Sequence, residues 1–212
     1  MTVIRATNPR EERRQLHQQL SRTQLLDAAE EIFGQKGFHD TTLKEIADRA
    51  DFSVGSVYSF FENKDDLYVN IFLRRGSEFL PAFEDALEGA TDGLDAVARI
   101  VSFEVSFLRA RPSFSDLYLR STASLVPTEN EATSEEVRQN ADRVLEMQAD
   151  VIRRGQVDGS IRLGDPSALS RLLSSMVQAF QSVESNPSAS NRFAFSLEEF
   201  QAVVRAAFVR PT

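Results

Sequence analysis

The segment that decides the fold is Thr41–Lys64, TTLKEIADRADFSVGSVYSFFENK. Thr42 is a good N-cap, and Glu45 follows it at the spacing of a capping box. The apolar side chains that come next fall at helical spacing and predict a short amphipathic helix: Leu43, Ile46, Ala47 and Ala50. A sharp turn is predicted at Asp51-Phe52, because aspartate tolerates the left-handed backbone that such a turn requires.

A second short helix is predicted after Ser53, which can cap it. At about 100° per residue, its apolar side chains gather on one side: Val54, Val57, Phe60 and Phe61. The opposite side carries Gly55 and Ser59, flanked by Ser56 and Tyr58. A solvated surface helix normally carries charged residues at such positions. The glycine and the hydroxyls instead indicate a surface that presses against DNA or against another protein helix.

Two short helices joined by a tight turn are the build of a helix-turn-helix, whose second helix lies in the DNA major groove. Ser56, Tyr58 and Ser59 carry hydroxyls that can bond to phosphates or base edges. Lys64 begins the next helix, and a lysine beside a helix N-terminus suits a phosphate contact. Glu62 is unfavourable here, because it places an acid near a polyanion.

Taken together, these residues resemble the TetR family of transcriptional regulators over roughly residues 20–70. The chain departs from the family pattern at Asp51-Phe52, where Gly-Val is common, and at Ser59-Phe60, where a histidine or aromatic pair is frequent. The matching positions are Leu25, Leu26, Asp27, Ala28, Ala29, Ile32, Phe33, Gly37, Phe38, Thr41, Thr42, Ile46, Ala47, Ala50, Ser53, Gly55, Ser56, Val57, Tyr58, Phe61, Lys64 and Leu67.

The resemblance implies an all-α protein in three parts. These are a basic N-terminal arm (residues 1–20), a three-helix DNA-binding head with the helix-turn-helix (21–66) and a helical ligand-binding and dimerisation domain (67–212). The side chains implied to contact phosphates are Thr42, Ser53, Tyr58 and Lys64. Those implied to lie nearest the base edges are Gly55, Ser56 and Ser59, with Val54 and Lys44 as helpers.

Charge is distributed unevenly along the chain. The net charge is −8, yet residues 1–64 carry nine basic and ten acidic residues, so most of the acidity lies in the remainder. Residues 1–24 carry five arginines against two glutamates. This basic arm is predicted either to lie along the DNA backbone or in a minor groove, or to be a frayed, solvated terminus.

The apolar pattern past Lys64 is helical almost throughout. A long helix is predicted to link head and body, with Pro81 expected to break or bend it. Gly155 to Gly164 is expected to interrupt a later helix, and residues 121–134 read as a loop. Further helices are predicted at about 94–108, from Pro112, at about 137–152, and over 166–185 and 197–210.

The last two predicted helices, 166–185 and 197–210, are apolar on more than one face. Burial in a homodimer interface explains this pattern, and so does full internal burial. The resemblance also implies a cavity for a small apolar or amphipathic effector. Its candidate lining residues, which core packing explains equally well, are Phe72, Phe79, Phe103, Phe107, Phe114, Tyr118, Met147 and Met176.

Enzymatic chemistry finds little support in the sequence. Cysteine is absent, and the two histidines, His17 and His39, have no partner nucleophile nearby in the chain. We find no glycine-rich phosphate loop and no metal-ligand spacing, so catalytic residues, metals and cofactors are not predicted. A secretory signal and a membrane-spanning run are not predicted either, and a cytoplasmic location is expected.

The predicted function is therefore a ligand-responsive DNA-binding regulator. The family's usual mode is repression, with a dimer on an inverted-repeat operator that is released by the effector. Half-sites about one helical turn apart, roughly 34 Å, or a little more suit such a dimer. The alternative is a regulator or architectural protein that answers to a protein partner and has no small-molecule inducer.

Overall fold

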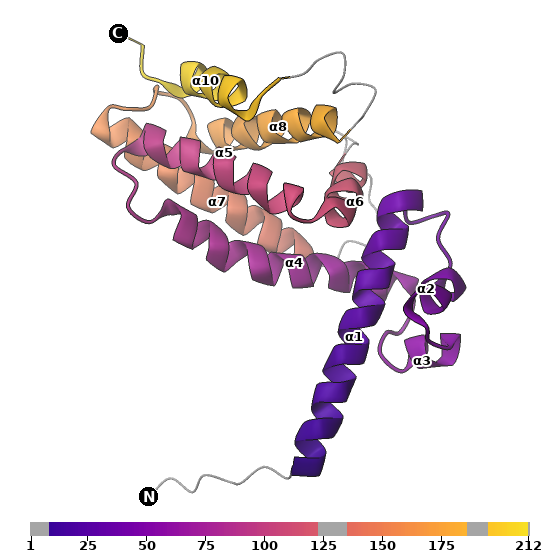
Figure 1. The fold of residues 1–212 in the computed structure, drawn as a ribbon. Helices are drawn as coiled ribbons and strands as arrows, with labels where there is room; N and C mark the ends of the chain where they lie inside the picture. Colours follow the sequence, from indigo (N-terminus) through magenta and orange to yellow (C-terminus); the bar gives the residue numbers. More distant parts are fainter. Residues whose placement is uncertain (1–8, 123–134, 186–194, 212) are drawn as a thin grey trace, which may run out of the picture.

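The structure, a computed structural model, describes residues 9–122, 135–185 and 195–211. Within these residues the regular elements are all α-helices, and an isolated antiparallel bridge joins Ile161 to Val209. Figure 1 shows a small N-terminal group of helices at one end and a larger bundle at the other, joined by one long helix. The predicted all-α fold, with an N-terminal helix-turn-helix and a helical C-terminal part, is confirmed.

The helices of the N-terminal head are α1 (Pro9–Lys36), α2 (Leu43–Ala50) and α3 (Val54–Tyr58). The predicted capping box is confirmed, since the side chains of Thr42 and Glu45 each bond to the other residue's backbone N–H. Asp51 ends α2 in the left-handed conformation, with φ 60° and ψ 41°. Ser53 caps α3, as predicted. These caps and this turn fix α3 against α2.

The first helix begins earlier than expected, which corrects the interpretation of residues 1–20 as an arm ahead of it. α1 starts at Pro9, so residues 9–20 are helical and continue without a break into the head. Proline suits the first turn of a helix, and the acidic Glu11 and Glu12 suit its positive end. Glycine and proline are absent from residues 10–33. Residues 1–8 of the predicted arm lie outside the described residues.

The body is built from longer helices. Their bounds are α4 (Lys64–Leu87), α5 (Gly93–Arg109), α6 (Pro112–Thr122), α7 (Glu135–Asp158), α8 (Pro166–Glu184) and α10 (Leu197–Phe208). Of the loop predicted over 121–134, the first two residues belong to α6, and residues 123–134 lie outside the described part of the chain.

Pro81 does not break α4, which corrects the first of the two predicted outcomes, a break or a bend. The helix continues through it to Leu87. An internal proline costs roughly 3 kcal/mol in helix stability. Pro81 itself faces solvent, and the next turn of the helix buries Phe83 in the body core. Burial of that ring, together with the packing of Phe79, offsets the local cost.

Gly155 does not end α7, because it lies inside the helix at a close crossing. A Cβ added to Gly93 would lie 2.3 Å from the Cα of Gly155, and one added to Gly155 would lie 2.9 Å from the Cα of Gly93. The side chain of Ile161 fills the adjoining space. Both glycines therefore serve the packing of α5 against α7 rather than a turn.

Two apolar cores hold the molecule together. The first belongs to the head, yet α5 and α6 contribute Phe107, Leu108, Phe114 and Leu117 to it, beside Phe33 of α1. The second lies between α5, α7, α8 and α10. In it the rings of Phe180 and Phe200 stack 4.5 Å apart, at 8° to one another. Head and body are thus joined through shared side chains as well as through α4.

Candidate nucleic-acid interface

The outward face of α3 is the centre of the candidate interface. Val57 and Phe61 are buried in the head core and anchor the helix from behind. Tyr58 is 57% exposed. Gly55 and Ser59 are exposed on the same outer surface, with Ser59 just past the end of the helix. Residues of the predicted DNA-reading set thus share one accessible face.

Gly55 has no internal reason to be a glycine. An added Cβ would meet only the Oγ of Ser53, at the ordinary distance of 3.7 Å. Its position inside a helix costs roughly 1 kcal/mol relative to alanine. A glycine at this open position is explained if another molecule must approach the helix backbone closely.

The three serines of this face form one hydrogen-bonded set. The Oγ of Ser53 accepts the backbone N–H of Ser56 at 3.0 Å and lies 2.8 Å from the Oγ of Ser56. The hydroxyl of Ser59 donates to the carbonyl of Ser56 at 2.6 Å. Hydroxyls held in this way keep accepting capacity and have fixed positions. Val54 is half-buried beside them.

The two lysines predicted to help have different surroundings. Lys44 is exposed, and its Nζ lies 3.9 Å from a carboxylate oxygen of Asp48. The Nζ of Lys64 donates to the carbonyls of Phe38 at 2.8 Å and Thr41 at 3.0 Å, and lies 4.3 Å from the centre of the Phe38 ring. Lys64 therefore ties the start of α4 to the loop before α2, and two of its three protons are engaged there.

The acidic cap of α2 is neutralised locally. Lys36 contacts the carboxylate of Glu45, and the Thr42 backbone N–H and hydroxyl donate to the same group. These bonds, that of Lys36 first, lower the pKa of Glu45 to about 2. The hydroxyl of Thr42, one of the predicted phosphate contacts, is thus engaged in the cap of α2.

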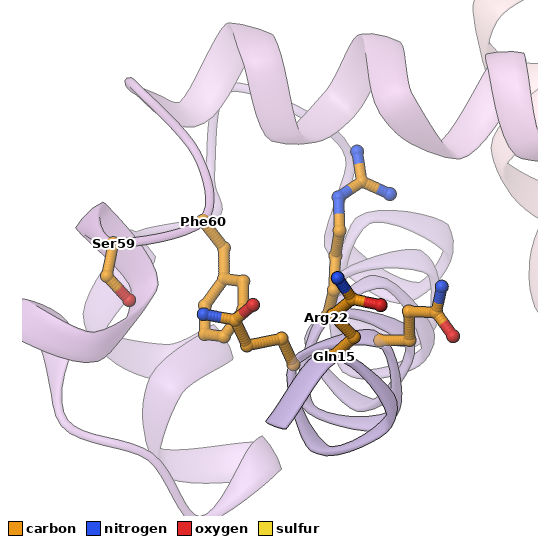
Figure 2. A pocket seen from close by; sticks show the side chains of 6 residues that line it. Gln15, Arg22, Ser59 and Phe60 are labelled. Carbon is orange, nitrogen blue, oxygen red and sulfur yellow. The ribbon is translucent and has the colours of Figure 1, made fainter. Parts of the chain in front are cut away.

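A polar groove of about 390 Å³ lies beside this face, between α1 and the end of α3 (Figure 2). Its lining residues are Gln15, Gln18, Gln19, Arg22, Ser59 and Phe60. The sequence analysis did not identify the four residues of α1, although their i, i+3, i+4, i+7 spacing places them on one face of a helix. They were overlooked because residues 1–20 were interpreted as an arm rather than a helix.

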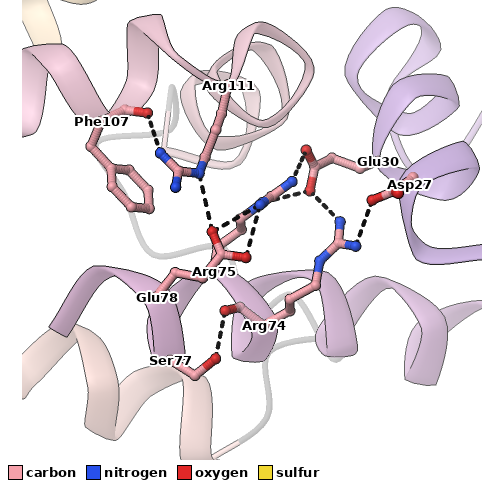
Figure 3. Close-up of polar contacts among 8 residues, drawn as sticks. All are labelled: Asp27, Glu30, Arg74, Arg75, Ser77, Glu78, Phe107 and Arg111. Atoms are coloured by element: carbon pink, nitrogen blue, oxygen red, sulfur yellow. Dashed lines mark hydrogen bonds and ion pairs between the residues drawn. The ribbon is translucent and has the colours of Figure 1, made fainter. Parts of the chain in front are cut away.

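A network of charged side chains joins the head to the body (Figure 3). Glu30 of α1 is only 5% exposed and accepts hydrogen bonds from Arg74 at 2.9 Å and from Arg75 at 2.8 and 2.9 Å. Arg75 also donates to Glu78, which accepts from Arg111 at 3.1 Å. The network therefore links α1, α4 and the turn between α5 and α6.

The candidate effector-binding residues fall into neighbouring aromatic groups. The ring of Phe79 lies 5.0 Å from those of Phe103 and Phe107. A second group runs from Phe72 to Phe114 at 5.7 Å and on to Tyr118 at 6.1 Å. Met147 of α7 and Met176 of α8 are half-buried against the second core. Of these eight side chains, Phe79 and Phe103 pack against both cores, and the others pack in one core or the other.

A buried carboxyl group, which the sequence analysis did not single out, lies near this region. Glu104 of α5 accepts a hydrogen bond from the amide of Gln148 at 2.7 Å, and Gln148 accepts one from Ser174 at 3.0 Å. Burial raises the pKa of Glu104 to about 7, with the Gln148 hydrogen bond opposing it. The sequence does contain an indication of this buried group, because Glu104 lies at helical spacing between the apolar residues Ile100 and Leu108.

Other kinds of site find no geometric support in the described ranges. Among residues 9–122, 135–185 and 195–211, we find no group of three or more histidine, cysteine or acidic side chains placed to hold a metal ion. Over the same residues, the helices lack the combination of length and apolar character that a membrane span requires.

Comparison with known proteins agrees with the geometry of the head. Residues 25–71 match the model of the bacterial regulatory proteins, tetR family. The fatty acid metabolism regulator protein of Bacillus subtilis is 27% identical over 85 residues, which is 40% of this chain and 44% of that protein. The chain thus spans less than half the length of that relative.

Two further similarities reach into the body. The transcriptional repressor KstR2 of Rhodococcus jostii is 26% identical over 141 residues, covering 66% of this chain and 68% of the relative. The solved structure of a tetR-family regulatory protein from Rhodococcus RHA1 has a TM-score of 0.74 at 20% identity, over 91% of this chain and 98% of that one. Residues 25–71 therefore match the tetR family of bacterial regulatory proteins, and the likeness in fold to tetR-family structures extends over most of the chain.

Proposed function

We propose that this protein is a transcriptional regulator that binds an inverted-repeat operator in double-stranded DNA as a dimer. The observation that carries the proposal is the outer face of α3, which is open, uncharged at its centre and built from Gly55 and ordered hydroxyls. Tyr58 stands exposed on the same face. The glycine on this face lowers helix stability, and close contact with the major groove of DNA offsets that cost.

Dimerisation through α8 and α10 is supported by their outer surfaces. Most of their large apolar side chains, among them Phe180, Phe200 and Phe208, are buried within the chain and need no partner. Leu172 and Val203, however, are each 48% exposed. The exposed stripe around Leu172 on α8 carries no charged residue: Ala168, Leu172, Ser175, Ala179 and Ser182. This stripe on α8, together with the exposed Val203 on α10, suits a two-fold interface.

Control by a small apolar or amphipathic effector, with repression as the default, completes the proposal. The aromatic groups around Phe79 and Phe72 lie on α4, the helix that starts at the DNA-binding head. An effector that favours one arrangement of these rings shifts the population of α4 positions and hence the spacing of two heads. The names of the relatives from Bacillus subtilis and Rhodococcus jostii, a fatty acid metabolism regulator and a repressor, agree with this class.

The first test is selection of genomic DNA fragments by the purified protein. We expect the bound fragments to share an inverted repeat, and genes beside it to indicate the effector. Tyr58→Ala, which removes an exposed phosphate contact, is expected to bind all duplexes more weakly with a shallower salt dependence. Full affinity of that variant would contradict the role of α3.

The second test addresses control. Compounds suggested by the neighbouring genes are added to the protein–operator complex, and release of DNA is measured. A compound that binds the protein and leaves operator affinity unchanged would reject the effector model and favour a protein partner.

A further inference from the structure

The groove beside α3 is formed by elements far apart in sequence. Figure 2 shows Gln15 and Arg22 on α1 on one side of Phe60, and Ser59 on the other. The residues that α1 contributes are Gln15, Gln18, Gln19 and Arg22, which share one face of the helix. All six lining side chains are neutral or basic, so the groove is free of acidic lining.

The half of α1 that carries this face stands clear of the rest of the described molecule. Residues 9–20 are exposed throughout. Figure 1 shows this half projecting beyond α2 and α3, in the direction that leads away from the body. Twelve helical residues extend about 18 Å. This exceeds the width of a major groove, about 12 Å, so a helix of this length lying across the groove spans it.

Arg22 is fixed at the base of the groove. Its guanidinium donates to the Oδ1 of Asn70 and lies 5.0 Å from the centre of the Phe61 ring. The Nδ2 of Asn70 donates in turn to the carboxylate of Asp66 at 2.7 Å. These contacts hold a positive charge in place before any ligand arrives, and a guanidinium is well suited to phosphate oxygens.

We propose that this groove binds the sugar–phosphate backbone of the same duplex whose major groove receives α3. The assignment rests on the proposed DNA-binding function and adds a second contact surface to it. Ser59 belongs both to the outer face of α3 and to the groove, so the DNA strand that passes α3 next meets the glutamines of α1. Their amides donate to phosphate oxygens in any sequence, so affinity extends into flanking DNA of arbitrary composition.

The test compares two variants with equal added charge on operator fragments selected by the wild-type protein. Gln18→Glu with Gln19→Glu places two carboxylates in the groove. His17→Glu with Leu20→Glu places two on the opposite side of α1, at equally exposed positions. We expect the groove variant to bind about tenfold more weakly or worse, and the control to stay within about threefold. Circular dichroism is expected to show both variants folded.

Hydroxyl-radical footprinting supplies an independent readout. The groove variant is expected to lose backbone protection flanking each half-site and to keep the protection due to α3, whereas Tyr58→Ala loses affinity overall. Equal weakening by the two charge variants, or an unchanged footprint of the groove variant, would overturn this assignment alone. Wild-type protein that binds no duplex would overturn the proposed function as well.

Discussion

Gly55 is the residue at which folding and DNA binding make opposite demands. An alanine there meets no close neighbour in the described chain, and it removes the helix penalty of glycine. Gly55→Ala is therefore expected to raise the free energy of unfolding by up to about 1 kcal/mol and to weaken operator binding. Urea denaturation and a DNA titration measure the two effects.

Gly93→Ala provides the contrast for that prediction. Its added Cβ would lie 2.3 Å from the Gly155 backbone, so stability is expected to fall rather than rise. If Gly55→Ala stabilises the protein and leaves operator affinity intact, α3 does not press against DNA at that position.

Glu104 is expected to make stability depend on pH. Its pKa is raised to about 7 from an ordinary 4.5, so the folded protein keeps a proton that the unfolded chain has lost. The free energy of unfolding therefore falls as pH rises through the window between these values. Glu104→Gln keeps an acceptor for Gln148 and removes the titration.

The Glu104→Gln variant is expected to match wild type at pH 4 and to exceed its stability at pH 8 by at most about 3 kcal/mol. Urea denaturation at pH 4, 6 and 8 measures the difference. A difference that does not change with pH would show that the buried carboxyl group does not carry the effect.

At the residue scale, sequence reasoning succeeded where one side chain acts on its own backbone. Thr42 with Glu45, Asp51 and Ser53 could be placed because caps and turns are local. The surroundings of Lys64 could not be foreseen, since its partner carbonyls lie 23 and 26 residues earlier in the chain.

At the scale of elements, one buried carboxylate is central to the polar contact between α1 and α4. Glu30 balances both Arg74 and Arg75. Glu30→Gln leaves Arg74 with Asp27 and Arg75 with Glu78, both more exposed carboxylates, so the free energy of unfolding is expected to drop by about 2 kcal/mol. Glu11→Gln, which loosens an exposed pair with Arg14 at 3.7 Å, is expected to change little and serves as control.

Thermal denaturation of the two glutamate variants makes the comparison. Equal stability of Glu30→Gln and wild type would mean that the carboxylate of Glu30 does not stabilise the contact between head and body.

Element boundaries were less predictable than element types. The start of α1 was missed because the basic charge of residues 1–20 was given more weight than their helical spacing. A break at Pro81 was considered because the burial of Phe83, which holds the helix together there, cannot be predicted from the local sequence. Gly155 was read as a break for a similar reason, since its role appears only in the crossing with Gly93. In each instance tertiary packing outweighed a local signal.

At the scale of the whole molecule, assembly is expected to depend on the outer stripe of α8 and α10. Leu172→Lys with Val203→Lys places like charges on both sides of a two-fold interface, so the dimer is expected to dissociate and operator affinity to fall. Val157→Lys, at a residue 86% exposed on α7, adds the same kind of charge away from the stripe. Sedimentation velocity at micromolar concentration distinguishes the outcomes. A monomeric wild-type protein would refute the interface.

Composition alone could not have located the DNA-binding surface, because the net charge of −8 opposes DNA. The acidity lies mainly after residue 64, so the charge distribution favours approach of DNA with the head leading. Operator binding is accordingly expected to weaken steeply with added salt.

The first apolar core takes Phe107, Leu108, Phe114 and Leu117 from beyond the head. A fragment cut after residue 66 would therefore lose one wall of its interior and uncover the ring of Phe33, against which the ring of Tyr68 packs at 5.3 Å. Such a fragment cannot be expected to fold on its own, whatever the motif suggests. The reading module is therefore expected to unfold together with the rest of the chain, in a single cooperative transition.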